Sequence, residues 1–278
     1  MTRKKVEIFL LGGLGNQLFG WAAGFSLAKK LDCGLKINVS QLSTRSLSIP
    51  DRILNDTEIS RDSSLYYESK SKLLKQFLRN IPFNTSYFEK EFSFENRFNK
   101  ISRPVKLYGY FQSHEYFADF NLEILRILDD ELNFTNDAKE IRAKLPDRFI
   151  SIHFRRGDYV NNSDFHPLAT KEYYERALHH VRNVGMDYKI VVFTDDVSLA
   201  QEVFPTDLIL SQRDLSDPFD NMYLMSKGEA IIGANSSFSL WAGFLLSARG
   251  GTCIFPNRWF GSGRLKDLTP VPPEFIQF

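Results

Sequence analysis

Cysteine is scarce in this sequence, with only Cys33 and Cys253 among 278 residues. Two cysteines are too few for a disulfide scaffold or a cysteine-rich zinc module, so both classes are excluded. An excess of either charge is lacking too, because 35 Lys and Arg balance 34 Asp and Glu. This balance argues against a general nucleic-acid binder, although it is compatible with one local basic site.

Long apolar runs are also few. The basic start, Met1 to Lys5, resembles part of a signal peptide, but Glu7 interrupts the apolar run that follows. The uncharged stretch 230–248 is long enough to span a bilayer, yet Asn235 and Ser236 lie within it. These polar residues favour a buried strand, a polar turn and a buried helix. The sequence therefore predicts a soluble, cytoplasmic protein.

Peripheral contact with the inner face of a membrane is left open. Six basic residues could provide it by attraction to anionic lipids, and these are Arg3, Lys4, Lys5, Lys70, Lys72 and Lys75. The alternative is a solvated charged face, which the nearly neutral overall charge favours.

The composition is that of a globular protein, with 43% hydrophobic and 14% aromatic residues. Strand-like and helix-like segments alternate in two blocks, one at the N-terminus and one after Pro146. Such alternation predicts α/β units with mainly parallel strands. We expect domains at 1–145 and 146–278, with the extreme C-terminus free to pack back on the first. Residues 41–105 show no pattern that assigns their fold.

A glycine-rich segment, Gly12-Gly-Leu-Gly-Asn-Gln17, lies between the first predicted strand and its helix. Glycines let a backbone approach a ligand closely, and the N-terminus of a helix favours an anion. The spacing matches neither the dinucleotide-binding fingerprint nor the phosphate loop that ends in Gly-Lys-Ser/Thr. The alternative is a tight structural turn, with Asn16 as a helix cap.

The segment His153-Phe-Arg-Arg-Gly-Asp-Tyr159 follows the first predicted strand of the second block. In an extended segment, His153 and Arg155 point to the same side. Guanidinium groups bind phosphate oxygens in pairs, so Arg155 and Arg156 indicate an anion site, most simply for phosphate. One alternative is a surface ion-pair cluster in which Asp158 neutralises an arginine. An adhesion tripeptide is disfavoured, because neither secretion nor an exposed loop is indicated.

Two further predicted strands end in polar residues. Asp195 and Asp196 offer carboxylates for a base edge, a ribose or a metal ion, but either can instead cap the next helix. The segment Asn235-Ser-Ser237 suits a phosphate at a helix N-terminus, with a simple helix cap as the alternative. Ligands of open α/β sheets bind beyond the carboxyl ends of the strands, so these residues mark where chemistry is expected.

Together these segments resemble glycosyltransferase family eleven, the α-1,2-fucosyltransferases. The resemblance rests on five segments in family order, namely Gly12-Gly-Leu-Gly-Asn-Gln-Leu-Phe19, Gly109-Tyr-Phe-Gln112, His153-Phe-Arg-Arg-Gly-Asp-Tyr159, Phe193-Thr-Asp-Asp196 and Asn235-Ser-Ser-Phe-Ser-Leu-Trp-Ala242. The match is weak at 40–105, where acceptor preference is expected to reside. The chain starts directly at the first strand, so it looks like a bacterial-type enzyme.

The resemblance implies a GT-B-like α/β fold with two Rossmann-like halves facing across a cleft. The first domain would be on the acceptor side, and the second would bind GDP-β-L-fucose. The implied reaction transfers fucose with inversion to the 2-hydroxyl of a terminal galactose, on an oligosaccharide or a lipid-linked glycan. No metal or other cofactor is implied.

The resemblance also implies roles for single residues. Arg155 should meet the diphosphate, and Asn16 should reach across the cleft toward the diphosphate or the fucose. His153 and one of the two adjacent aspartates should contact guanosine. The remaining residues expected to bind substrate are Arg156, Asp195, Asp196, Asn235, Ser236, Ser237, Phe238, Gly13 and Gly15.

The acceptor hydroxyl needs a base at some stage of the transfer. Asp158 and Asp164 are nearest in sequence to the arginines, and His166 and Glu115 are alternatives. Gly157 could instead only allow a turn that brings Asp158 back to fix an arginine.

Three other functions stay open: transfer of another deoxysugar, a different fucosyl linkage, and an inactive nucleotide-sugar-binding protein. The intact set of Arg155, Asn16 and the serines argues against the last of these. A metal-dependent transferase would carry an Asp-x-Asp motif in a loop, and Asp195-Asp196 lacks that spacing.

Overall fold

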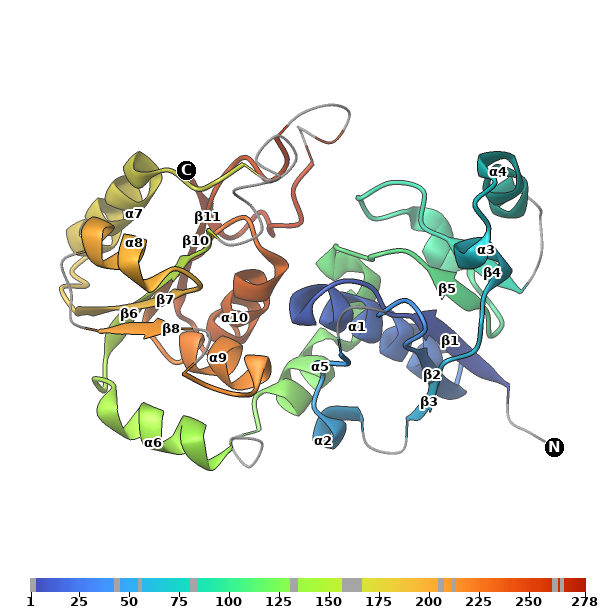
Figure 1. Cartoon of the computed structure of the whole chain (residues 1–278), viewed down its shortest axis with the longest axis horizontal. Helices are drawn as coiled ribbons and strands as arrows, with labels where there is room; N and C mark the ends of the chain where they lie inside the picture. Colours follow the sequence, from blue (N-terminus) through green and yellow to red (C-terminus); the bar gives the residue numbers. More distant parts are fainter. Residues whose placement is uncertain are drawn as a thin grey trace. The chain divides into compact units, whose positions relative to one another are not determined.

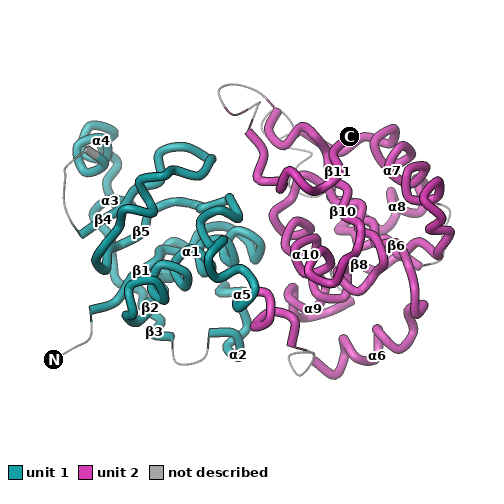
Figure 2. The backbone as a smooth tube through the Cα atoms, turned by 180° about the vertical axis from the view of Figure 1, so that it is seen from behind, with its two compact units in different colours: residues 1–124 teal, residues 125–278 magenta. Residues whose placement is uncertain are grey.

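The computed structural model describes residues 4–42, 46–54, 57–80, 85–130, 135–156, 167–204, 208–211, 214–261, 265 and 268–278. The chain forms two compact units, Met1–Ile124 and Leu125–Phe278 (Figure 2). Each unit contains one parallel β-sheet with helices on its faces (Figure 1). The expected α/β fold with two Rossmann-like halves is confirmed.

The units divide after Ile124, which is earlier than the boundary expected at Pro146. Helix α6 (Asn136–Lys144) lies between these positions, and the hydroxyl of its cap residue Thr135 donates to Asp220 in unit 2. Pro146 lies just before the first strand of the second sheet, but α6, which precedes Pro146, already belongs to unit 2. At the other end, β11 (Ile276–Gln277) pairs with the second sheet.

The second sheet has the strand order β11-β10-β9-β6-β7-β8, and its pairs are parallel. Its remaining strands are β6 (Phe149–Phe154), β7 (Lys189–Thr194), β8 (Ile209–Ser211), β9 (Ala230–Ile232) and β10 (Thr252–Phe255). The chain adds β7 and β8 on one side of β6 and then returns to add β9 on the other side. This is the Rossmann order, and its switch point lies between β6 and β9.

Alternate residues of β6 face opposite sides of this sheet, because successive side chains of a strand point to opposite faces. Ile150, Ile152 and Phe154 pack into the core formed with α7 and α8. Ser151 and His153 face the other side, where Ser151 Oγ donates to a carbonyl of α9 at 2.6 Å. Besides α6, this unit contains the helices α7 (Lys171–Asn183), α8 (Val197–Val203), α9 (Pro218–Met225) and α10 (Ser237–Ser247).

The first sheet has the strand order β3-β2-β1-β5-β4, again with parallel pairs. Its strands are β1 (Lys5–Phe9), β2 (Gly34–Asn38), β3 (Glu58–Ser60), β4 (Ser86–Phe88) and β5 (Lys106–Tyr108). Helix α1 (Leu14–Lys30) packs closely on β1, and a Cβ added at Gly24 would lie 3.1 Å from Ile8. The other helices are α2 (Asp51–Leu54), α3 (Leu65–Glu68), α4 (Lys72–Asn80), α5 (Asn121–Leu128), η1 (Asn96–Lys100) and η2 (His114–Phe120), where η marks a 3-10 helix.

Aromatic side chains cover the face of this sheet opposite α1. The ring of Tyr108 stacks between Phe9 and Phe88, with both pairs of ring centroids 4.7 Å apart. Tyr66 and Tyr67 of α3 pack on this stack. Residues 41–105, whose fold the sequence left unassigned, thus supply β3, β4 and the helices that cover this face.

The uncharged stretch 230–248 forms β9, a polar turn and α10, as the sequence predicted. No helix within the described part of the chain is both long enough and apolar enough to cross a membrane.

Candidate functional site

Arg155 follows β6 directly and is held by a carboxylate from the next strand. Its Nη1 lies 2.9 Å from Oδ2 of Asp195, which follows β7. The other oxygen of Asp195 accepts the backbone N–H of Arg156 at 2.8 Å. The Arg155 side chain is still 23% exposed. The ion pair therefore orients a guanidinium at the carboxyl edge of the sheet without withdrawing it from solvent.

The two neighbouring residues of the same types make structural contacts instead. The Arg156 guanidinium lies over the Phe154 ring and donates to a carbonyl just before α7 at 3.0 Å. The Asp196 side chain caps α8 by accepting a backbone N–H of its first turn at 3.1 Å. Either aspartate could have capped the helix by its position in the sequence, and in the structure the cap is Asp196.

His153 is fully buried and neutral. Burial and the neighbouring Arg155 charge lower the pKa of its imidazole to about 3. The ring lies 5.6 Å from that of Phe238, and neither ring nitrogen has a hydrogen-bond partner among the residues that the structure describes. A neutral ring with an unpaired donor and acceptor suits the edge of a nucleobase better than a phosphate.

In the segment after β9, Asn235 has a structural role, and the residues from Ser236 onward begin α10. Asn235 Nδ2 donates to the carbonyls of Pro167 and Trp259, so its side chain ties the strand end to two loops. Ser236 occupies the N-cap position of α10, but its side chain makes no cap hydrogen bond. Ser237 and Phe238 are half-buried. The alternative reading of this segment as a simple helix cap thus holds for the position of Ser236, but its side chain makes no cap hydrogen bond.

The contrast with other helices of unit 2 is clear. Helices α6, α7 and α9 begin with side-chain caps from Thr135, Thr170 and Asp217. Helix α10 begins beside the switch point and has none. Helix α10 therefore lacks the side-chain cap hydrogen bond with which α6, α7, α8 and α9 begin, and an anion suits such a position.

The glycine-rich segment of unit 1 differs in one respect from the alternative of a structural turn capped by Asn16. Helix α1 begins at Leu14 with Gly13 as its N-cap, so Gly15 is buried within the first turn and Asn16 is not the cap. A Cβ at Gly12, where φ is +69°, would lie 2.6 Å from Asn16 Nδ2. Glycine at this position therefore makes room for the Asn16 side chain.

Asn16 is oriented by a residue that sequence reasoning did not single out. Its Oδ1 accepts a hydrogen bond from Gln112 Nε2 at 2.6 Å. Gln112 follows β5, the strand beside β1, so the contact bridges the switch point of the first sheet. Gln112 lies within a segment that carries the family resemblance, but only the strand order shows that it reaches Asn16.

Three of the proposed bases, Asp158, Asp164 and His166, lie outside the described residues, and so does Gly157. Glu115, the fourth, is exposed in η2. Asp195 is the described partner of Arg155, a pairing that the sequence did not predict. The strand order could have indicated it, because β6 and β7 are neighbours.

Two Rossmann-like units, with an oriented arginine at the carboxyl edge of the second sheet, are the architecture of a glycosyltransferase of GT-B-like fold. Such an enzyme transfers a sugar from a nucleotide donor. The chain belongs to glycosyl transferase family 11, whose profile matches residues 2–274.

Relatives and solved structures agree with this assignment. The O-antigen biosynthesis glycosyltransferase WbnK of Escherichia coli is 28% identical, over 94% of this chain and 96% of the relative. The alpha-1,2-colitosyltransferase of Escherichia coli is 27% identical, over 96% and 97%. A mutant of Arabidopsis thaliana FUT1 in complex with GDP has a TM-score of 0.51 and 13% identity, covering 91% of this chain and 70% of its own. It supports the fold.

Proposed function

We propose that this enzyme transfers L-fucose from GDP-β-L-fucose, with inversion, to the 2-hydroxyl of a terminal galactose on a glycan. Membership of glycosyl transferase family 11 supports the reaction class. Two observations carry the donor assignment. The Arg155–Asp195 ion pair lies at the carboxyl ends of β6 and β7, and His153 of β6 lies 5.6 Å from Phe238 at the start of α10, which has no side-chain cap. A fixed cation and the N-terminus of a helix suit the diphosphate of a nucleotide sugar.

Arg155 acts on the leaving group. As the bond from fucose to GDP breaks, negative charge grows on the diphosphate while the sugar becomes cationic. A guanidinium already oriented by Asp195 stabilises that charge without reorganising during the step. His153, Ser236, Ser237 and Phe238 are proposed to hold the rest of the nucleotide, and Asn16 to donate to the diphosphate or the fucose. Gly13 would permit close approach.

The proposed reaction requires no metal ion. Both oxygens of Asp195 contact the adjacent arginines, and Asp196 caps α8, so these carboxylates already have protein partners. The cationic role that a metal would have at the leaving group belongs to Arg155 in this proposal.

The test is transfer from GDP-fucose to a panel of galactosides, with and without a chelator. We expect a fucosylated product in both conditions, with release of GDP. A reaction that stops with chelator would contradict metal independence. No product with any galactoside would contradict the proposed reaction.

Transfer of colitose is a second candidate, because one relative is named an alpha-1,2-colitosyltransferase. The same panel, supplied with nucleotide-activated colitose in place of GDP-fucose, decides between the donors. The donor with the higher kcat/KM is the substrate.

We also propose peripheral contact with an anionic membrane through α4. Leu73 and Phe77 lie one turn apart and are 79% and 62% exposed, next to the basic side chains of Lys72 and Lys75. An exposed apolar pair flanked by lysines suits the interface of a bilayer rich in anionic lipid.

Flotation with anionic vesicles tests this contact. The wild type is expected to float at low salt and much less at high salt, and a Leu73→Ser, Phe77→Ser double variant to stay at the bottom in both. If wild type and double variant distribute equally in the gradient, α4 does not mediate membrane binding.

A further inference from the structure

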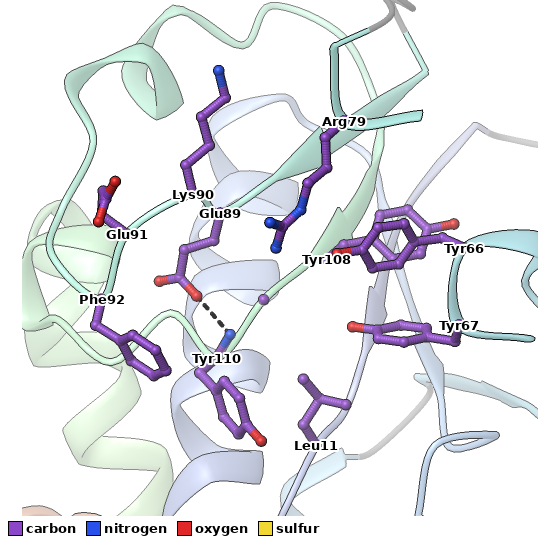
Figure 3. A pocket seen from close by; sticks show the side chains of 11 residues that line it. Leu11, Tyr66, Tyr67, Arg79, Glu89, Lys90, Glu91, Phe92, Tyr108 and Tyr110 are labelled. Atoms are coloured by element: carbon purple, nitrogen blue, oxygen red, sulfur yellow. Dashed lines mark hydrogen bonds between the residues drawn. The ribbon is translucent and has the colours of Figure 1, made fainter. Parts of the chain in front are cut away.

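Unit 1 contains a pocket of about 220 Å³ at the carboxyl ends of β1, β4 and β5 (Figure 3). We call it the aromatic pocket. The residues used below to describe it are Leu11, Tyr67, Glu89, Phe92, Gly109 and Tyr110. None of them is among the predicted site residues. The volume is below the roughly 300–1,000 Å³ of pockets for drug-sized ligands, so it suits one small ring.

Glu89 follows β4 and is 8% exposed. Its Oε2 accepts the backbone N–H groups of Tyr110 at 2.7 Å and Phe111 at 3.0 Å. Its Oε1 has no hydrogen-bond partner in the part of the chain that the structure describes. An unpaired carboxylate oxygen is costly to bury, so a ligand that donates a hydrogen bond here removes that cost.

The backbone around Glu89 is shaped to admit this side chain. A Cβ at Gly109 would lie 2.4 Å from Glu89 Cβ and 2.5 Å from Oε2, so only glycine leaves room. Phe111 has φ of +54°, a strained conformation for a buried phenylalanine. The two N–H bonds to Glu89 stabilise this turn, which leads directly to Gln112.

The walls of the pocket suit an uncharged sugar. Phe92 and Tyr110 stack with centroids 5.8 Å apart and are half-buried, as is Tyr67. Such rings offer flat apolar surface for the C–H face of a pyranose, and the Tyr hydroxyls offer polar contacts. The charged lining residues comprise two cations and two carboxylates, Arg79, Lys90, Glu89 and Glu91. This balance does not favour a strongly anionic ligand.

We propose that the aromatic pocket binds the acceptor saccharide and that Glu89 Oε1 takes the proton of the hydroxyl that is glycosylated. This inference rests on the proposed function. In the step, the acceptor oxygen bonds to the anomeric carbon of the donor sugar. The bond from that carbon to the diphosphate breaks, and its electron pair leaves with the nucleotide. The O–H bond breaks, and its proton passes to Glu89, which later releases it to water.

The environment of Glu89 suits a base near neutral pH. Burial raises the pKa of Glu89 to about 7, although the N–H groups of Phe111 and Tyr110 oppose the rise. A carboxylate with this pKa is a far stronger base than an exposed one. Below pH 7 it is protonated and cannot accept the proton, so activity should fall as the pH falls.

The tyrosines and Glu95 near Glu89 do not titrate near neutral pH, where Glu89 does. The titratable and charged groups around Glu89 are Tyr67, Tyr116, Glu95, Arg79, Lys90 and Glu91. Burial raises the pKa values of both tyrosines far above neutral, and the Tyr116 hydroxyl donates to Ser93. Hydrogen bonds from Arg97 and backbone N–H groups lower the pKa of Glu95, so Glu95 stays charged and opposes ionisation of Glu89.

The variant Glu89→Gln separates the catalytic role from the structural one. The amide oxygen of Gln can accept both backbone N–H groups, so the turn is kept. The NH₂ group then takes the place of Oε1 and cannot accept a proton. We expect kcat to fall at least about a hundredfold, at the low end for a general base, while GDP binding and the melting temperature stay unchanged.

The pH profile gives a second readout. Wild-type kcat should fall about tenfold per pH unit well below pH 7, and Glu89→Gln should lose this dependence. Glu68→Gln on α3, an exposed carboxylate outside the pocket, is the matched control and should behave as wild type.

The possible outcomes are distinct. Normal wild-type transfer together with an active Glu89→Gln, within a few-fold of wild type, overturns this inference and leaves the proposed function standing. A Glu89→Gln variant that loses GDP binding or melts early shows a structural role and also overturns it. Absence of wild-type transfer to every galactoside overturns the proposed function and this inference with it.

Discussion

Replacing Arg155 by Ala is expected to lower kcat/KM for the nucleotide sugar at least about a hundredfold. The loss corresponds to about 3 kcal/mol of transition-state stabilisation, the scale of removing one preorganised donor from a developing anion. The reason lies in the Asp195 contact, which fixes the guanidinium before the leaving group becomes charged. Initial rates at several donor concentrations measure the effect.

Two further variants test whether the loss of activity in Arg155→Ala comes from the guanidinium at this position. Arg155→Lys keeps the charge beside Asp195 but loses the fork geometry, so it should recover little activity. Arg148→Ala removes an arginine just before the other end of β6, which pairs with Glu229 at 2.9 Å and is 59% exposed. It should retain wild-type rates. Near-normal turnover of a folded Arg155→Ala would show that Arg155 does not meet the diphosphate.

Replacing Asn16 by Asp is expected to lower kcat more than replacing it by Ala, and both more than they lower GDP affinity. Asp can still accept the hydrogen bond from Gln112 that Asn16 Oδ1 accepts at 2.6 Å, so the turn is kept. It loses the amide donor, however, and places a negative charge where we propose contact with the diphosphate or the fucose. An interaction that strengthens in the transition state appears in kcat rather than in binding.

The measurements are kcat, GDP affinity and a melting curve for both variants. Gln112→Ala is a useful companion, because it removes the hydrogen bond from Gln112 to Asn16 without changing the Asn16 side chain itself. We expect it to lower kcat less than Asn16→Asp does. Equal activity of Asn16→Asp and wild type would show that Asn16 never contacts the donor and serves the turn alone.

The sequence predicted the second unit in more detail than the first. The strands from Phe149 to Phe255 are short apolar runs that end in polar residues, and buried parallel strands give this pattern. By contrast, β3 and β4 are three residues long, and the helices between them have little burial of their own. Such elements are ordered by packing on Phe9 and Tyr108, which no local pattern reveals.

The candidate site shows the same limit. Residue types and their positions after strands indicated Arg155, His153 and Asn16. Their partners, Asp195 and Gln112, follow neighbouring strands that are distant in sequence. Only the strand order shows which strand ends meet. Glu89 escaped prediction because it follows a strand that the sequence did not reveal.

The most direct test of the account is a calorimetric titration with GDP, in the presence of a chelator, of wild type, Arg155→Ala and Arg148→Ala. In the proposed function, GDP binds at the carboxyl edge of β6, where Arg155 lies, and not at the end beside Arg148. Wild type and Arg148→Ala should therefore bind GDP with equal affinity, and Arg155→Ala at least about tenfold more weakly, the scale of losing one charge-assisted hydrogen bond. Equal affinity of all three proteins, or no binding to wild type, would contradict it.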